Sequence, residues 1–183
     1  MKKIRIILLS LVAILLPTVW VACGDDDDKD LPDNGGAVPV KAQATFKLQP
    51  NQEMNDMLQM TVTYLKNGSY TTQNLHNTIN YIYVSNMDIP ATFAVRVDCQ
   101  LKDGVELTKD SYQFMLSVST INYQLFDSKG KPIDKYTHNT PISEEGMTVS
   151  KEELAEMGSF TFYSNAYEVL GDGSYNILLD YKW

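Results

Sequence analysis

The sequence predicts an all-β fold, built as an antiparallel β-sandwich of about eight strands. From residue 37 onward, apolar and polar residues alternate with a period of two, as they do in strands that are buried on one side. Dipeptides that favour tight turns separate these runs, and only one segment has both the composition and the end signals of a good helix. A small closed β-barrel fits the same pattern and is the alternative.

The first strands are expected at 41–48 and 58–64, where apolar residues alternate with lysine, glutamine and threonine. The most regular alternation runs through 91–102. Its odd-numbered positions share one apolar face: Ala91, Phe93, Val95, Val97, Cys99 and Leu101. Because Cys99 lies between two aliphatic neighbours on that face, we expect a buried and unreactive thiol.

Further strands are expected at 112–118, 121–125, 160–162 and 175–183. The apolar positions are even-numbered in the first of these and odd-numbered in the second, so the pattern slips by one residue between them. Such a slip predicts a β-bulge or a strand that changes sheets. The last strand is expected to belong to the core and to be completed by Trp183.

Tight turns are expected at four dipeptides that end in glycine: Asn67-Gly68, Asp103-Gly104, Lys129-Gly130 and Asp172-Gly173. A short helix is expected at 151–157, because Ser150 and Glu153 form a capping box and Gly158 supplies a stop. A further turn of helix is expected at 51–57. Short strands joined by long loops favour a sandwich of immunoglobulin-like or transthyretin-like outline over a lipocalin-like barrel.

The N-terminus has the order of a signal peptide. Lys2, Lys3 and Arg5 are followed by an apolar run at 6–16, which is shorter than the roughly 20 residues that span a bilayer. Val21-Ala22-Cys23 then resembles the lipobox of bacterial lipoproteins. The resemblance implies that residues 1–22 are removed as a signal peptide and that Cys23 carries the acyl chains that enter the lipid bilayer.

Four aspartates lie just after this cysteine: Asp25, Asp26, Asp27 and Asp28. The segment Gly-Asp-Asp-Asp-Asp resembles the export signal of surface lipoproteins of Bacteroidota. The resemblance implies a protein that is lipid-anchored in the outer membrane and faces outward on the cell surface. Residues 23–36 are rich in Asp, Pro and Gly and cannot bury a core, so we expect a flexible tether before a single domain at 37–183.

The composition argues against several classes of function. The net charge is −8 and Arg96 is the only arginine after Arg5, so a nucleic-acid partner is not expected. The two Cys lie 76 positions apart and the two His lie 62 positions apart, which is far from the close spacing of zinc-finger ligands, and we expect no metal and no cofactor. No spacing typical of a nucleophilic or metal-dependent hydrolase occurs, so we assign no catalytic residue and expect a protein that is not an enzyme.

The stretch 64–83 is the best candidate for a ligand site, because it is rich in tyrosine and asparagine. Tyrosine rings stack on sugar rings, and amides exchange hydrogen bonds with hydroxyl groups. The candidate ligand-binding residues are Tyr70, His76, Tyr81 and Tyr83. The alternative is that these tyrosines pack against each other across strands, between polar loops.

These observations predict a non-enzymatic surface lipoprotein that binds an extracellular glycan or protein, as an accessory of uptake or adhesion. Two alternatives stay open. A structural or assembly lipoprotein of the envelope or of fimbriae would expose an apolar edge or patch. A lipocalin-like carrier of a small molecule would enclose a large apolar cavity.

Overall fold

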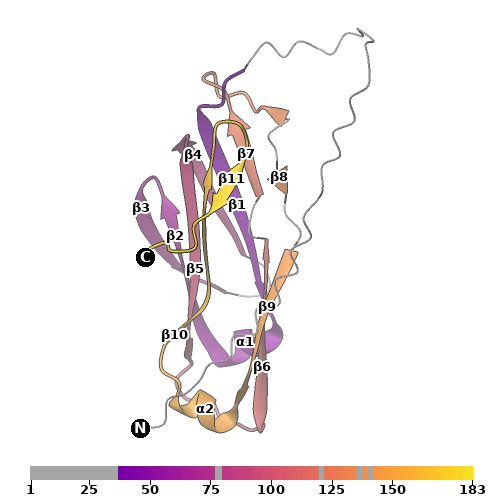
Figure 1. The fold of residues 1–183 in the computed structure, drawn as a ribbon. Coiled ribbons are helices and arrows are strands. Elements are labelled where there is room, and N and C mark those ends of the chain that lie inside the picture. The colour runs from indigo at the N-terminus through magenta and orange to yellow at the C-terminus, as the bar shows by residue number, and fades with distance from the viewer. Residues whose placement is uncertain (1–36, 77–79, 120–121, 135–137, 140–141) are drawn as a thin grey trace, which may run out of the picture. The chain divides into compact units, whose positions relative to one another are not determined.

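Two antiparallel sheets pack face to face in the part of the chain that the structure describes (Figure 1). The computed structural model describes residues 37–76, 80–119, 122–134, 138–139 and 142–183. The predicted signal peptide, Cys23 and the acidic run lie outside these residues. The arrangement confirms the predicted all-β, sandwich-like class, and the described strands do not close into a barrel.

Sheet A contains six strands: β1 (Lys41–Pro50), β4 (Asn80–Asp88), β6 (Ser111–Ser119), β7 (Asn122–Phe126), β8 (His138–Asn139) and β9 (Ile142–Ser150). Sheet B contains five, in the order β11 (Tyr175–Ile177), β10 (Phe160–Val169), β5 (Ala91–Leu101), β2 (Leu58–Lys66) and β3 (Ser69–Asn74). The two short helices are α1 (Gln52–Met57) and α2 (Lys151–Glu156).

Strand β1 organises sheet A, because it pairs with β4 along one edge and with both β6 and β7 along the other. Lys47 pairs with Ser119 of β6, and Ala44 pairs with Tyr123 of β7. The two residues of β1 are three positions apart in sequence, whereas their two partners are four positions apart. The register of β1 therefore shifts by one residue between its pairing with β6 and its pairing with β7, which confirms the predicted one-residue slip. Both strands stay in sheet A, so the alternative of a strand changing sheets is wrong.

Alternate residues of the facing strands fill the core between the sheets. Phe46 of β1 and Phe93 of β5 pack against Tyr167 of β10, with ring centroids 6.1 and 5.6 Å from the Tyr167 ring. All three side chains are at most 1% exposed, and burial of rings of this size stabilises the fold by roughly 1.5–3 kcal/mol each. Cys99 lies in the same core, as predicted.

Tight turns form where glycine takes a positive φ. Asn67 and Gly68, with φ of 52° and 74°, join β2 to β3, and Gly173, with φ of 82°, lies in the turn between β10 and β11. Both predicted helices are present. Ser150 and Glu153 form the expected capping box at the start of α2, and Asn51 caps α1 by accepting a hydrogen bond from the backbone nitrogen of Met54.

The last predicted strand is much shorter than expected. β11 ends at Ile177, and residues 178–183, here called the C-terminal segment, lie across the outer face of sheet B. Three of its side chains, Leu178, Tyr181 and Trp183, cover a second, smaller hydrophobic cluster formed by Leu65, Ala94 and Ala166. The expectation that Trp183 completes a core strand is wrong, because its ring packs on this outer cluster rather than between the sheets. None of the described helices is long and apolar enough to cross a membrane.

Candidate functional site

The structure separates the four candidate ligand-binding residues into three places. Tyr81 and Tyr83 lie together on the outer face of sheet A. Tyr70 lies on the outer face of sheet B, on the edge strand β3. His76 follows the end of β3 and lines a cleft. The predicted tyrosine-rich stretch therefore forms no single face.

Strand β4 presents Tyr81 and Tyr83 to solvent because it alternates. The side chains of Ile82 and Val84 are at most 1% exposed and belong to the core, so their neighbours must point outward. Among the described strands, β4 pairs only with β1 and thus forms an edge of sheet A. The contact between these two rings lies within one strand, so it is not the cross-strand packing that the sequence left as the alternative.

Tyr81 and Tyr83 form an exposed aromatic pair. They are 50% and 65% exposed, with ring centroids 6.2 Å apart and ring planes only 23° from parallel. Neither hydroxyl group has a hydrogen-bond partner among the described residues. Because rings that remain this exposed add little to the packing of the core, their position is better suited to contact with a ligand. We call these two residues the tyrosine pair.

Polar side chains of β1 lie beside the tyrosine pair. In the register of the sheet, Lys47 lies opposite Tyr81 and Thr45 lies opposite Tyr83. Gln43, two positions farther along the same face of β1, is exposed. An ammonium, a hydroxyl and an amide next to two aromatic rings form a surface that can stack on a sugar ring and also bind its substituents.

Tyr70 is held by the C-terminal segment. Its hydroxyl donates a hydrogen bond to the backbone oxygen of Lys182 at 3.1 Å and lies 3.3 Å from the hydroxyl of Tyr181. Its ring lies 5.9 Å from that of Trp183. Burial, reinforced by the Tyr70 hydrogen bond, raises the pKa of Tyr181 to about 12. These contacts hold the C-terminal segment against β3, so Tyr70 has a structural role.

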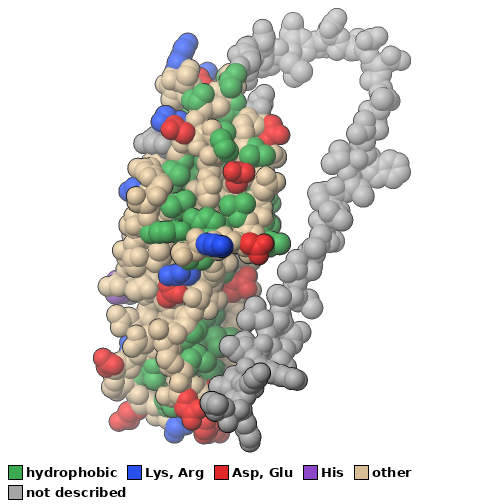
Figure 2. All heavy atoms as spheres, turned by 60° about the vertical axis from the view of Figure 1, so that its left-hand side comes forward, with side chains coloured by type: hydrophobic (Ala, Val, Ile, Leu, Met, Phe, Trp, Pro, Cys, Tyr) green, Lys and Arg blue, Asp and Glu red, His purple; other side chains and the backbone are tan. Residues whose placement is uncertain are grey.

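The guanidinium group of Arg96 adds to this fastening. It lies 5.2 Å from the centre of the Trp183 ring, at cation–π distance, and its Nε also binds Asp98 at 2.8 Å. Figure 2 shows the side of the molecule that is on the left in Figure 1, where hydrophobic side chains form a band with charged side chains beside it. On the outer face of sheet B, the side chains of Tyr181 and Trp183 cover the smaller hydrophobic cluster, so their position has an explanation within the fold.

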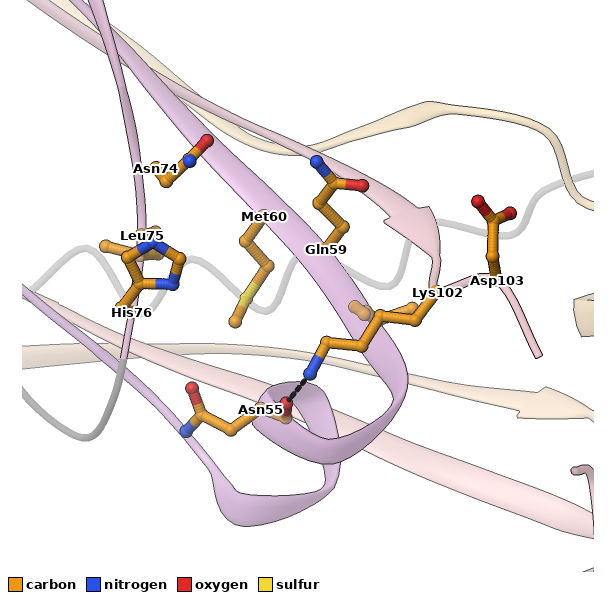
Figure 3. Close-up of a pocket in the computed structure, with 9 residues that line it drawn as sticks. Asn55, Gln59, Met60, Asn74, Leu75, His76, Lys102 and Asp103 are labelled. Atoms are coloured by element: carbon orange, nitrogen blue, oxygen red, sulfur yellow. Dashed lines mark hydrogen bonds between the residues drawn. The ribbon is translucent and has the colours of Figure 1, made fainter. Parts of the chain in front are cut away.

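His76 lines a cleft with a volume of about 360 Å³ at the end of the sandwich where α1 lies (Figure 3). The lining residues come from α1, from the start of β2, from the end of β3 and from the end of β5: Asn55, Leu58, Gln59, Met60, Asn74, Leu75, His76, Lys102 and Asp103. Three of them, Asn74, Leu75 and His76, lie in the predicted stretch 64–83, and His76 was the one expected to bind a ligand. The others were missed because strands that are distant in sequence bring them together.

Cys99 has no catalytic environment. It is 2% exposed, and burial, with a smaller contribution from Asp98, raises the pKa of its thiol to about 12, so the thiol stays protonated near neutral pH. His138 lies in the two-residue strand β8. Within the described ranges, no three His, Cys, Asp or Glu side chains gather in a group that could hold a metal ion.

Comparison of the chain with models of protein families, with curated proteins and with solved structures gives no match.

Proposed function

We propose that this protein is a non-enzymatic lipoprotein of the outer membrane, displayed on the cell surface, that binds an extracellular glycan through Tyr81 and Tyr83. It serves as an accessory of uptake or adhesion. The proposal retains the immunoglobulin-like or transthyretin-like outline predicted from the sequence, which the antiparallel pairing within both sheets supports.

The tyrosine pair carries the glycan part of this proposal. Two half-exposed rings, 6.2 Å apart and nearly parallel, stand two positions apart on one face of a strand. The apolar faces of consecutive sugar rings can stack on such a pair, and the ammonium of Lys47 and the hydroxyl of Thr45 lie in register beside it to bind sugar substituents. A protein partner is the other ligand class predicted from the sequence, and the polar surroundings of the pair favour a glycan.

The anchoring part of the proposal rests on the sequence before residue 37. Cys23 follows an apolar run and a lipobox-like tripeptide, and the aspartates from Asp25 to Asp28 resemble a surface-export signal. A polar tether between the lipid anchor and the domain extends the reach of the domain toward large ligands.

The test is affinity electrophoresis of the full chain in detergent, through gels that contain a glycan chosen from a glycan array. The Tyr81→Ala/Tyr83→Ala variant is expected to bind at least about fivefold more weakly, because two ring contacts together contribute about 1–3 kcal/mol. Leu179→Ala is the matched control, since it removes an apolar side chain that is 89% exposed elsewhere. Equal retardation of the double variant and the wild type, or an array without any bound glycan, would overturn the proposal.

The assembly lipoprotein is the second candidate, and one observation favours it. Ile177 and Leu179 are 56% and 89% exposed and lie close together in sequence at the C-terminal end. Two exposed aliphatic side chains there are compatible with a protein contact. A carrier of lipocalin type has less support, because the described strands form two sheets around a packed core.

A further inference from the structure

The cleft beside His76 is a second place where the fold brings polar groups together. Figure 3 shows His76 and Asn74 on one side, Met60 in the middle and the long side chain of Lys102 reaching in from the opposite side. Gln59 projects from β2 between them. The floor is formed by the apolar side chains of Met60 and Leu75, which are at most 3% exposed. An apolar floor with polar groups around it is the usual composition of a small-molecule site.

Hydrogen bonds to backbone oxygens fix both walls of this cleft. The nitrogen of Leu75 donates to the oxygen of Met60 at 3.0 Å, which holds the chain next to His76 against β2. The side-chain amide of Asn80 donates to the backbone oxygen of His76 at 2.8 Å. On the opposite wall, the nitrogen of Lys102 donates to the oxygen of Met57 at 2.9 Å. A ligand therefore meets walls that are already in place, which lowers the entropic cost of binding.

The charge of Lys102 has no counter-ion in the described structure. Its Nζ donates one hydrogen bond, at 2.6 Å, to the backbone oxygen of Asn55, and the ion pairs between described residues do not include it. Asp103 is the next residue, but in Figure 3 its carboxylate points away from the ammonium group. An ammonium can donate three hydrogen bonds, so two remain for a ligand.

We propose that this cleft binds a single carboxylate-bearing sugar unit, a hexuronic acid, with its carboxylate on Nζ of Lys102. The hydroxyl groups of the sugar are then bound by Gln59, Asn74 and His76, and its apolar face lies on Met60 and Leu75. A volume of about 360 Å³ lies within the range of small-ligand sites. A charge-assisted hydrogen bond to a carboxylate is about twice as strong as a neutral one, so the acidic sugar is preferred over a neutral sugar of the same size.

This inference deepens the proposed glycan binding and rests on it, because it specifies an acidic glycan, but it uses residues on a different part of the sandwich. The tyrosine pair provides a stacking surface for a chain of sugars, and the cleft selects one acidic unit. The two sites can therefore fail independently, and the experiment is designed to separate them.

The test is calorimetric titration of the full chain in detergent with glucuronate and, as the neutral counterpart, glucose. Glucuronate is expected to bind at least about tenfold more tightly than glucose. Lys102→Met is expected to remove this preference by weakening glucuronate binding at least about tenfold. Lys129→Met, an exposed lysine in a turn, removes the same charge elsewhere and is expected to change neither affinity. Equal binding of the two sugars to the wild type, or no binding of glucuronate, would overturn the inference.

Lys102 also binds a carbonyl oxygen of α1, so its replacement can loosen that helix. His76→Ala therefore serves as a second variant, because it removes a hydroxyl-binding group and leaves the backbone contacts of the wall in place. It is expected to weaken both sugars by a similar factor, with an unchanged melting temperature. Unchanged glucuronate affinity in both variants contradicts the inference. Glucuronate binding that persists in Tyr81→Ala/Tyr83→Ala supports the cleft, whatever happens to the binding of longer glycans.

Discussion

Tyr81 and Tyr83 stand on the solvent face of one edge strand with their ring centroids 6.2 Å apart and their planes 23° from parallel. The buried residue between them, Ile82, fixes this arrangement, because it orients the strand so that both rings point outward. Since the core does not need these rings, their removal separates binding from folding. This property makes the proposed function testable by substitution.

Lipidation at Cys23 is tested by labelling cells with radioactive palmitate. The wild type is expected to incorporate the label, and Cys23→Ser is expected to lose it and to keep residues 1–22, as the mass of the purified chain would show. Cys99→Ser is the matched control because Cys99 is the other cysteine and is buried in the core, so that variant is expected to remain labelled. Label in Cys23→Ser contradicts the proposed anchor.

The C-terminal segment is expected to stabilise the domain. Trp183→Ala removes the ring contacts with Tyr70 and Tyr181 and the cation–π contact with Arg96, and it uncovers the smaller hydrophobic cluster. We expect the free energy of unfolding in urea to fall by about 1–3 kcal/mol. Leu179→Ala, which alters an exposed side chain of the same segment, is expected to change it by less than about 0.5 kcal/mol. Equal effects of the two variants would show that the segment is not packed as described.

Tyr70 is expected to contribute to stability and not to glycan binding. Tyr70→Phe removes the hydroxyl that bonds to Lys182 and Tyr181 but keeps the ring beside Trp183. The free energy of unfolding should fall by about 0.5–1.5 kcal/mol, while retardation in the glycan gel stays that of the wild type. A loss of glycan affinity with unchanged stability would instead show that Tyr70 takes part in glycan binding.

The stability of the domain is expected to fall in alkaline solution. Burial raises the pKa of Cys99 from 9.0 to about 12, so between these pH values the folded protein keeps a proton that the unfolded chain has lost. The free energy of unfolding therefore decreases as the pH rises, by roughly 1 kcal/mol per pH unit from this thiol. Burial also raises the pKa of Tyr163 and Tyr167, which steepens the decrease above about pH 10.

Urea unfolding between pH 8 and pH 11 checks this prediction. Cys99→Ala removes the titrating thiol and is expected to show a shallower decrease than the wild type. The buried tyrosines contribute equally to both proteins, so the difference between the two slopes isolates Cys99. Identical slopes would mean that the thiol does not carry the effect.

Several strands with one buried face were predicted from the sequence, but β4, which alternates in the same way, was not, and neither was β3, which is exposed on both faces. β5 and β6 alternate because one side of each faces the core. β3 carries only one partly buried residue, Thr71, so it has no apolar pattern to recognise. At 175–183 the alternating pattern predicted one long core strand, but Tyr181 and Trp183 cover a cluster on the outside of sheet B rather than the core. The same period of two arises from either form of burial.

The candidate site was predictable in part for a related reason. Tyr81 and Tyr83 alternate with buried aliphatic residues, so their common face follows from local sequence. The separation of Tyr70 from them depends on the sheet that each strand joins, which only the register shows. The cleft depends on the hydrogen bond from Lys102 to the backbone oxygen of Asn55. The two residues are 47 positions apart, so local sequence patterns do not predict this contact.

The central claim is that the tyrosine pair binds glycan on the outside of the cell. The most direct measurement is retention of intact cells on glycan-coated beads, with and without prior protease treatment of the cell surface. Cells with the wild-type protein should be retained, and both protease treatment and the Tyr81→Ala/Tyr83→Ala variant should abolish retention, while Leu179→Ala cells are retained like the wild type. Retention of double-variant cells at the wild-type level, or a protein that resists protease until the outer membrane is broken, would contradict the account.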